Sequence, residues 1–203
     1  MSLVSVSTLK NYLPEIGSAT GADTELQNLL NRVESAVARF LGFPSPSGSA
    51  SAVQLESATY TLYFDSYSYN DNKILQMNIK PINSLTSVHV DVDRVYGSST
   101  ALTISNIDVD AVNGRLIIRP NKSDMFERGF RAIKVVCNAG FSSVPDDLEH
   151  AICVWASQLH RAKQNQGKEN ISQQGNSLRL SPKTIPEEVK QLLYPFRTPL
   201  TVL

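Results

Sequence analysis

The sequence has few cysteines, no long apolar run and no excess of charge of either sign. Its two cysteines, Cys137 and Cys153, cannot form a disulfide framework and favour a reducing compartment. No stretch of about 18 apolar residues is present, so no membrane span is expected. Basic and acidic residues number 19 each, which gives zero net charge. This balance argues against a dedicated nucleic-acid binder and against electrostatic docking on a membrane.

The sequence also lacks the short motifs of common catalytic and cofactor sites. It contains no P-loop, no G-x-S-x-G, no H-E-x-x-H and no G-x-G-x-x-G. His150 and Cys153 lie three residues apart in a helical pattern, but a metal site would need further ligands, and only Cys137 could join them. Burial would raise the pKa of Cys153 and make it a poor nucleophile. We therefore expect no catalytic residue, no metal and no cofactor.

Two acidic pairs and a group of tyrosines are the remaining candidates for chemistry. Asp91–Asp93 and Asp108–Asp110 each place two carboxylates on one face of a predicted strand. Such pairs can bind a cation or transfer protons, but a solvated strand face is the simpler interpretation. The four tyrosines within residues 60–69 could stack on a carbohydrate or a base. Because no basic residue lies beside them, a surface that contacts another protein is favoured.

Apolar residues spaced three and four apart predict two long helices. The first is expected over Asp23–Leu41, with Asp23 as its N-cap and Gly42 as the residue that ends it. The second is expected from Asp146 to Ala162, after Pro145, with acidic residues in its first turn. The two helices are expected to pack together. The facing residues would be Leu30, Val33 and Val37 on the first helix and Ile152, Trp155 and Leu159 on the second.

Two shorter helices are expected near the ends of the sequence. Ser7 or Thr8 can cap a short helix through Leu9 and Leu13. Another helix is predicted from Thr184 until Pro195 stops it. Residues 164–177, before this helix, are rich in Gln, Asn, Gly and Ser and predict a mobile loop.

Between the long helices the pattern changes to that of β-strands. Strands are expected over residues 59–64, 74–77, 85–95, 107–112, 115–118 and 131–138. Asn113–Gly114 predicts a two-residue hairpin turn. The predicted fold class is α+β, a helical core with an inserted antiparallel β module. Residues 1–51 and 142–203 would form the helical core and its C-terminal arm, and residues 52–141 the module.

Three segments stand in a recognisable order along the chain. A long acid-capped helix comes first, then A-G-F and V-P-D-D-L-E-H-A-I within residues 139–152, then I-P-E-E-V-K-Q-L-L-Y-P-F-R at residues 185–197. This series resembles the head-to-tail connector, or adaptor, proteins of long-tailed bacteriophages. The β module departs from small connectors, whose helices have a minimal link, and is similar to the insertion of longer adaptors.

The resemblance implies a structural virion protein and no enzyme. Such proteins form a ring, usually twelvefold, between the portal protein and a stopper or tail-terminator protein, and DNA only passes through the channel during packaging and ejection. They lie in the virion neck and are made in the bacterial host cytoplasm. Two alternatives stay open. One is another neck or tail-completion protein, and the other is a β-rich ligand-binding module.

The C-terminal segment, residues 185–203, carries more apolar side chains than a tail that stays in water. An amphipathic segment on a flexible tether is a common way to anchor in a partner, and C-terminal segments of connectors typically grip the portal or a neighbouring subunit. We therefore expect this segment to bind the portal or a neighbouring copy. The predicted partner-binding residues are Ile185, Val189, Leu193, Tyr194, Phe196 and Arg197.

Overall fold

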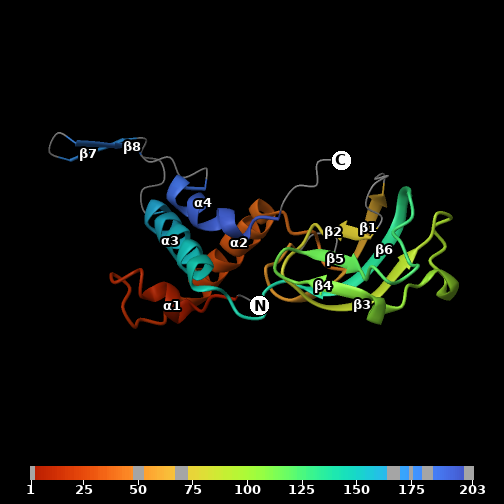
Figure 1. The fold of residues 1–203 in the computed structure, drawn as a ribbon. Coiled ribbons are helices and arrows are strands. Elements are labelled where there is room, and N and C mark those ends of the chain that lie inside the picture. Colours follow the sequence, from red (N-terminus) through yellow and green to blue (C-terminus); the bar gives the residue numbers. More distant parts are fainter. Residues whose placement is uncertain are drawn as a thin grey trace. The chain divides into compact units, whose positions relative to one another are not determined.

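A computed structural model describes residues 3–47, 53–66, 73–163, 170–173, 176–179 and 185–198 (Figure 1). Helices and antiparallel strands are both present, so the predicted α+β class is confirmed. The chain divides into two compact units. Unit 1 comprises Met1–Val37 and Ser143–Pro195, and unit 2 comprises Ala38–Ser142 and Phe196–Leu203. The predicted domain limits at residues 51/52 and 141/142 stay a prediction.

Unit 1 is helical and is organised around one central helix. Its helices are α1 (Val6–Lys10), α2 (Asp23–Leu41), α3 (Asp146–Lys163) and α4 (Glu187–Leu193), and the last turn of α2 belongs to unit 2. Helix α3 packs against both α1 and α4. The buried residues of α3 are Leu148, Ala151, Ile152, Cys153, Trp155, Ala156 and Ser157. Burial on so many sides makes α3 the core of this unit.

The long helix α2 covers the predicted range, but the prediction of Asp23 as its N-cap is wrong. The N–H of Leu26 donates a hydrogen bond to the carbonyl of Ala22, so Ala22 is the capping residue and Asp23 is the first residue of the helix. It begins at Asp23 and ends at Leu41, and Gly42 then adopts a left-handed φ of 86°. Leu30, Val33 and Val37 are buried, and Lys163 of α3 forms an ion pair with Glu25 of α2. Whether these buried residues pack directly on those of α3 stays a prediction.

The N-terminal cap of α1 lies earlier than predicted. Ser5 is the capping residue, and its Oγ accepts a hydrogen bond of 3.0 Å from the backbone N–H of Thr8. The expectation of Ser7 or Thr8 as the cap is therefore wrong. The preceding residues are held by a buried carboxylate, because Glu34 accepts hydrogen bonds from the N–H groups of Leu3 and Val4 at 3.3 and 2.9 Å.

Unit 2 contains two three-stranded antiparallel sheets. The first has the order β1-β6-β3, from strands β1 (Ala58–Ser66), β6 (Gly129–Ala139) and β3 (Ile82–Val90). The second has the order β2-β5-β4, from β2 (Ile74–Gln76), β5 (Arg115–Ile118) and β4 (Ile107–Asp110). The inward side chains of both sheets form the core of this unit. They include Tyr60, Leu62, Leu75, Val88, Ile107, Leu116, Ile118, Ile133, Val135 and Cys137.

Two strands end earlier than predicted, and the turn after the second changes with it. β3 ends at Val90, because the chain turns at Asp91 instead of continuing to residue 95. β4 ends at Asp110, so a four-residue turn over Ala111–Gly114 replaces the predicted two-residue turn. Glycine is required at position 114, since its φ is 68° and an added Cβ would lie 2.8 Å from the carbonyl oxygen of Ile79.

The segment predicted as a mobile loop contains a hairpin. β7 (Asn170–Gln173) and β8 (Asn176–Arg179) pair antiparallel, with Asn170 opposite Arg179 (Figure 1). Residues 164–169 and 174–175 of the predicted loop lie outside the described residues.

Among the helices that the structure describes, none has the length and apolarity needed to cross a membrane.

Trp155 provides the test of the unit 1 core. Replacing Trp155 with Ala is expected to destabilise the chain by about 3–5 kcal/mol, because truncation of a buried aromatic side chain leaves a cavity. The free energy of unfolding in urea measures the effect, with the exposed Asn28→Ala of α2 as the control. A loss below about 1 kcal/mol would show that Trp155 is not part of the core.

Candidate interaction surfaces

The histidine and cysteine candidates do not form a reactive site. The side chain of His150 forms a hydrogen bond with Tyr12, because Tyr12 Oη lies 2.9 Å from His150 Nδ1. Burial, followed by the charges of Glu149 and Glu34, raises the pKa of Cys153 to about 12. Cys137 belongs to unit 2, and burial raises its pKa to about 11. Both thiols are therefore protonated at neutral pH, and no three potential metal ligands cluster within the described residues.

The Asp91–Asp93 pair is not on a strand face, so that prediction is wrong. Asp91 follows the end of β3 and is buried. Its carboxylate accepts hydrogen bonds from the N–H groups of Asp93, Val95 and Tyr96, at 2.9, 3.1 and 2.7 Å. Burial alone would raise the pKa of Asp91, but the backbone N–H donors outweigh it and lower the pKa below its usual value. Asp91 thus organises a loop.

The second acidic pair lies on a strand, as predicted, and both carboxylates have local partners. Asp108 forms an ion pair of 2.9 Å with Arg119, and both side chains are about half exposed. Asp110 accepts hydrogen bonds from the side-chain amide and the backbone N–H of Asn113, and these bonds lower its pKa. The pair therefore supports the β4–β5 turn.

The tyrosines of residues 60–69 do not form a common platform in the described structure. Tyr60 is fully buried, and burial raises its pKa to about 12. Residues 67 and 69 lie outside the described residues. Tyr63 is exposed, its ring lies 4.3 Å beneath the guanidinium of Arg131, and it also contacts the ring of Tyr96 at 5.6 Å. The expectation that no basic residue lies beside the tyrosines is wrong, because β6 brings Arg131 next to β1.

These contacts belong to a feature that we call the loop tip, formed by residues 91–96 and 129–131 of unit 2. Three of its residues have left-handed backbone conformations, with φ of 63° at Arg94, 52° at Tyr96 and 50° at Arg131. Within the described part of the chain, these are the only non-glycine residues with positive φ. Tyr96 Oη donates a hydrogen bond of 2.6 Å to the carbonyl of Arg131. The N–H of Arg131 donates one of 2.7 Å to Asp65.

Sequence reasoning missed the loop tip because it extended a strand through it. The alternating valines of residues 88–92 gave a strand signal, and no glycine or proline in residues 91–96 marked the turn. The local signal was the buried aspartate that collects three backbone N–H groups. An Asp that precedes a turn is common in sequences, so this signal needs the structure to be recognised.

The six predicted partner-binding residues do not form one exposed surface. Val189 and Leu193 are fully buried within unit 1, where α4 packs on α3. Ile185 is half-buried, and Tyr194 is 50% exposed. In unit 2, the ring of Phe196 meets Phe141 edge-on at 6.0 Å. Helix α4 is thus part of a folded unit, although its role in binding a partner stays a prediction.

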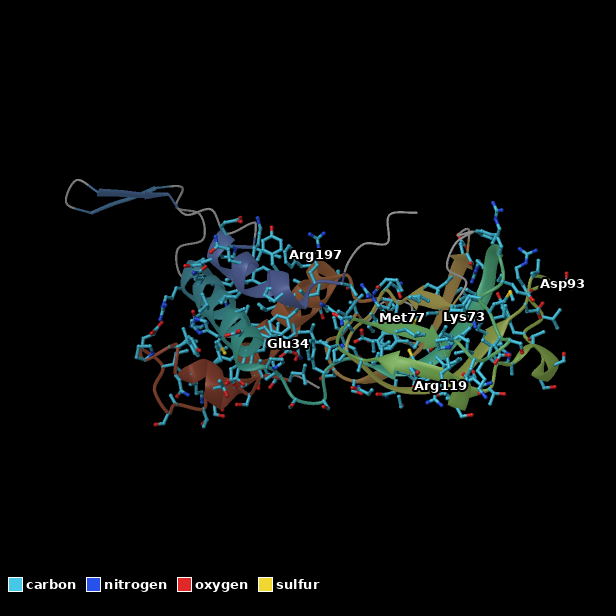
Figure 2. All side chains as sticks on the ribbon, viewed as in Figure 1. Glu34, Lys73, Met77, Asp93, Arg119 and Arg197 are labelled. Carbon is cyan, nitrogen blue, oxygen red and sulfur yellow. The ribbon has the colours of Figure 1, made fainter. Side chains whose placement is uncertain are left out.

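The last described residues of the chain are seated in unit 2. The guanidinium of Arg197 lies 5.7 Å from the ring of Phe40 (Figure 2). The hydroxyl and the N–H of Thr198 both donate hydrogen bonds to the carbonyl of Leu41, at 2.6 and 3.2 Å. Thr198 thereby satisfies a carbonyl at the end of α2 that has no partner within the helix. Gly42 leaves room for this contact, since an added Cβ would lie 3.2 Å from Thr198 Oγ1.

Comparison with known proteins gives a family and a fold. The family model of head completion proteins (HCP) matches residues 2–198. One similar chain comes from a structure described as "Neck of empty GTA particle computed with C6 symmetry". It has a TM-score of 0.56 and 18% identity, over 94% of this chain and 88% of that one. A second comes from "Virion of native gene transfer agent (GTA) particle", with a TM-score of 0.53 and 18% identity, over 90% and 81% of the two chains. No curated protein matches the sequence.

The Asp91 carboxylate predicts a pH dependence of stability. Because its pKa is lowered in the folded chain, its stabilising effect is complete above the usual aspartate pKa of about 4 and is lost as the pH falls below it. Asp91→Asn keeps the shape but not the charge, so thermal melts of this variant should lose less stability between pH 5 and pH 3 than those of the parent chain. Asp93→Asn is the control. Equal pH profiles of the parent and Asp91→Asn would refute this role.

Proposed function

The chain belongs to the head completion protein family, and from this premise we propose that it is a structural protein of the neck of a phage-like particle. The family match carries the proposal, because it extends over residues 2–198 and so includes both units. The fold likeness to chains from a gene transfer agent virion and its neck supports the same location. A structural role accounts for the described residues better than catalysis does, because the thiols are buried and the carboxylates hold turns.

Within the neck, the proposed arrangement is a ring of identical copies between the portal and a stopper or tail-terminator protein. The solved neck that resembles this chain was computed with sixfold symmetry, which is compatible with the twelvefold ring of a connector. DNA passes through the channel of such a ring. Zero net charge suits this passage, because a strongly basic wall would hold the phosphates. A stopper or tail-completion role in the same neck is the second candidate.

We propose that the C-terminal segment contacts the portal or a neighbouring copy through its exposed residues, whereas its buried residues hold it in place. Val189 and Leu193 hold α4 on α3 and so position the segment from inside unit 1. Tyr194 directly follows α4 and is half exposed, as an aromatic side chain that anchors in a partner would be. Phe196 and Arg197 follow Tyr194 within three residues, and Ile185 lies at the start of the segment.

Particles made without this chain provide the test of the function. We expect such heads to package DNA, to lose it afterwards, and to join no tails. Immuno-electron microscopy of complete particles should find the chain at a single vertex. Labelling spread over the capsid, or normal tailed particles formed without the chain, would contradict the proposal.

Tyr194 provides the test of the C-terminal contact. Tyr194→Asp is expected to reduce incorporation of the chain into heads at least about tenfold. The reason is that a charge would replace an aromatic side chain that becomes buried when the complex forms. Gln191→Asp, an exposed position of α4, is the matched control for the added charge. Quantitative immunoblots of purified heads measure incorporation, and circular dichroism confirms that both variants fold. Equal incorporation of the two variants would exclude Tyr194 from the contact.

A further inference from the structure

One sheet of unit 2, β1-β6-β3, has a face that points away from the core. Successive side chains of a strand point to opposite sides of a sheet, and the inward ones, such as Leu62, Val88 and Val135, are buried. The strand register places the alternate residues in rows across the other side, which we call the outer face. Its central residues are Thr61 and Tyr63 of β1, Ser87 and His89 of β3, and Lys134 and Val136 of β6. None of these six residues is acidic.

One row of the outer face carries cations held on tyrosine rings. Tyr63, Lys134 and His89 lie opposite one another on the three strands. The guanidinium of Arg131 lies 4.3 Å from the ring centre of Tyr63, and the ammonium of Lys134 lies 5.3 Å from the ring centre of Tyr96. The centres of the two rings are 5.6 Å apart. Two cations and two tyrosines thus form one cluster, which holds both charges in defined positions.

An irregularity of β6 brings Arg131 to this face. Residue 131 is three positions before Lys134, so in a regular strand the two side chains would lie on opposite faces. The register with β1 shifts at this point, and the successive residues Ala132 and Ile133 are both buried, so the alternation is interrupted. Bulges of this kind often redirect a side chain toward a functional site.

The side chain of Arg131 is not needed to hold the backbone at this position. The φ of Arg131 is 50°, a conformation that is costly for arginine and costs glycine almost nothing. Tyr96 Oη donates a hydrogen bond to the carbonyl of Arg131, and the N–H of Arg131 donates one to Asp65, so both bonds use backbone atoms of Arg131. Its guanidinium is therefore available to a ligand, which gives a reason for arginine where glycine would favour folding.

No carboxylate of the described residues forms an ion pair with Arg131 or Lys134. Three aspartates belong to the adjoining segments. Asp65 and Asp91 accept hydrogen bonds from backbone N–H groups, and Asp93 is exposed to solvent. The charges of both cations thus remain available to an external anion, although the net charge of the whole chain is zero.

The phosphate backbone of DNA is the anion that fits this cluster. Arginine and lysine, together with serine, threonine and tyrosine hydroxyls, are the side chains that commonly bind DNA phosphates. The outer face and Arg131 offer all of these types on one side of the sheet. The proposed ring brings a polyanion to every copy, because DNA passes through its channel. Two cations per copy give a weak contact that is independent of base sequence, which lets the DNA slide.

We propose that the outer face contacts the phosphates of the passing DNA, with Arg131 and Lys134 as the groups that bind them. The rings of Tyr63 and Tyr96 hold the two cations in place. This proposal rests on the proposed function, because it assigns the surface of unit 2 that faces the channel.

Fluorescence anisotropy of a short labelled DNA duplex, titrated with the full chain at several low salt concentrations, tests the contact. Arg131→Gln/Lys134→Gln is expected to weaken binding at the lowest salt at least about tenfold, because two phosphate contacts are lost. The slope of log K against log salt should become shallower by about 0.9 for each lost contact. No measurable binding by the parent chain at the lowest salt would overturn the proposal.

Matched variants separate the cluster from the general effect of charge. Arg32→Gln/Lys122→Gln removes the same charge at positions outside the outer face and should bind DNA as the parent chain does. Arg131→Lys/Lys134→Arg keeps both charges and should retain most of the binding. Circular dichroism confirms that all variants fold. Equal weakening by the two Gln variants would show that only net charge matters, and would overturn the proposal.

Photo-cross-linking in assembled particles identifies which molecule meets the outer face. A photoreactive amino acid in place of Ser87 should link the chain to DNA in filled particles. The same amino acid in place of Val112, an exposed position between β4 and β5, should give at least about tenfold less DNA-linked product. Links from position 87 to a protein, or none to DNA, would overturn this proposal and leave the function standing. Absence of the chain from the neck would overturn both.

Discussion

Unit 2 depends on the pairing of β6 with β1 on one side and β3 on the other. This central strand is eleven residues long and buries Ala132, Ile133, Val135, Cys137 and Ala139. Both ends of β6 contact residues that lie far away in the sequence. Arg131 near its start stacks on Tyr63 in the loop tip, and Phe141 just beyond its end contacts Phe196. Gly140 makes the exit possible, since an added Cβ would lie 2.7 Å from the carbonyl oxygen of Glu56.

Buried carboxylates in both units hold the backbone in place. Glu34 accepts hydrogen bonds from the N–H groups of Leu3 and Val4 and so fixes the chain before α1. Asp91 does the same for the loop after β3. Charge-assisted hydrogen bonds of this kind are stronger than neutral ones, and they are local, so they need no metal or disulfide. They suit a protein whose proposed task is to present surfaces of fixed shape.

The proposed neck function and the described geometry agree on what has to be rigid. A ring subunit must present the same surfaces on every copy, and both the loop tip and the seat of Thr198 are held by several hydrogen bonds. The seat joins the last described residue to the end of α2, 157 positions earlier in the chain. Packing of α4 on α3 likewise makes the predicted arm part of unit 1 up to Leu193.

The sequence by itself determined the elements whose signals are local. The apolar spacing and Gly42 predict the range of α2, the buried residues of α3 follow a helical period, and the order of three segments along the chain, taken as a resemblance, led to the correct family. Only the tertiary structure decided which residues meet across long stretches of chain. The stacking of Arg131 on Tyr63 and the capping of Leu41 by Thr198 depend on strand pairing and on chain path, which no local pattern encodes. The end of β3 at Val90 was decided by the N–H groups that Asp91 collects, against an alternation of valines that favoured a longer strand.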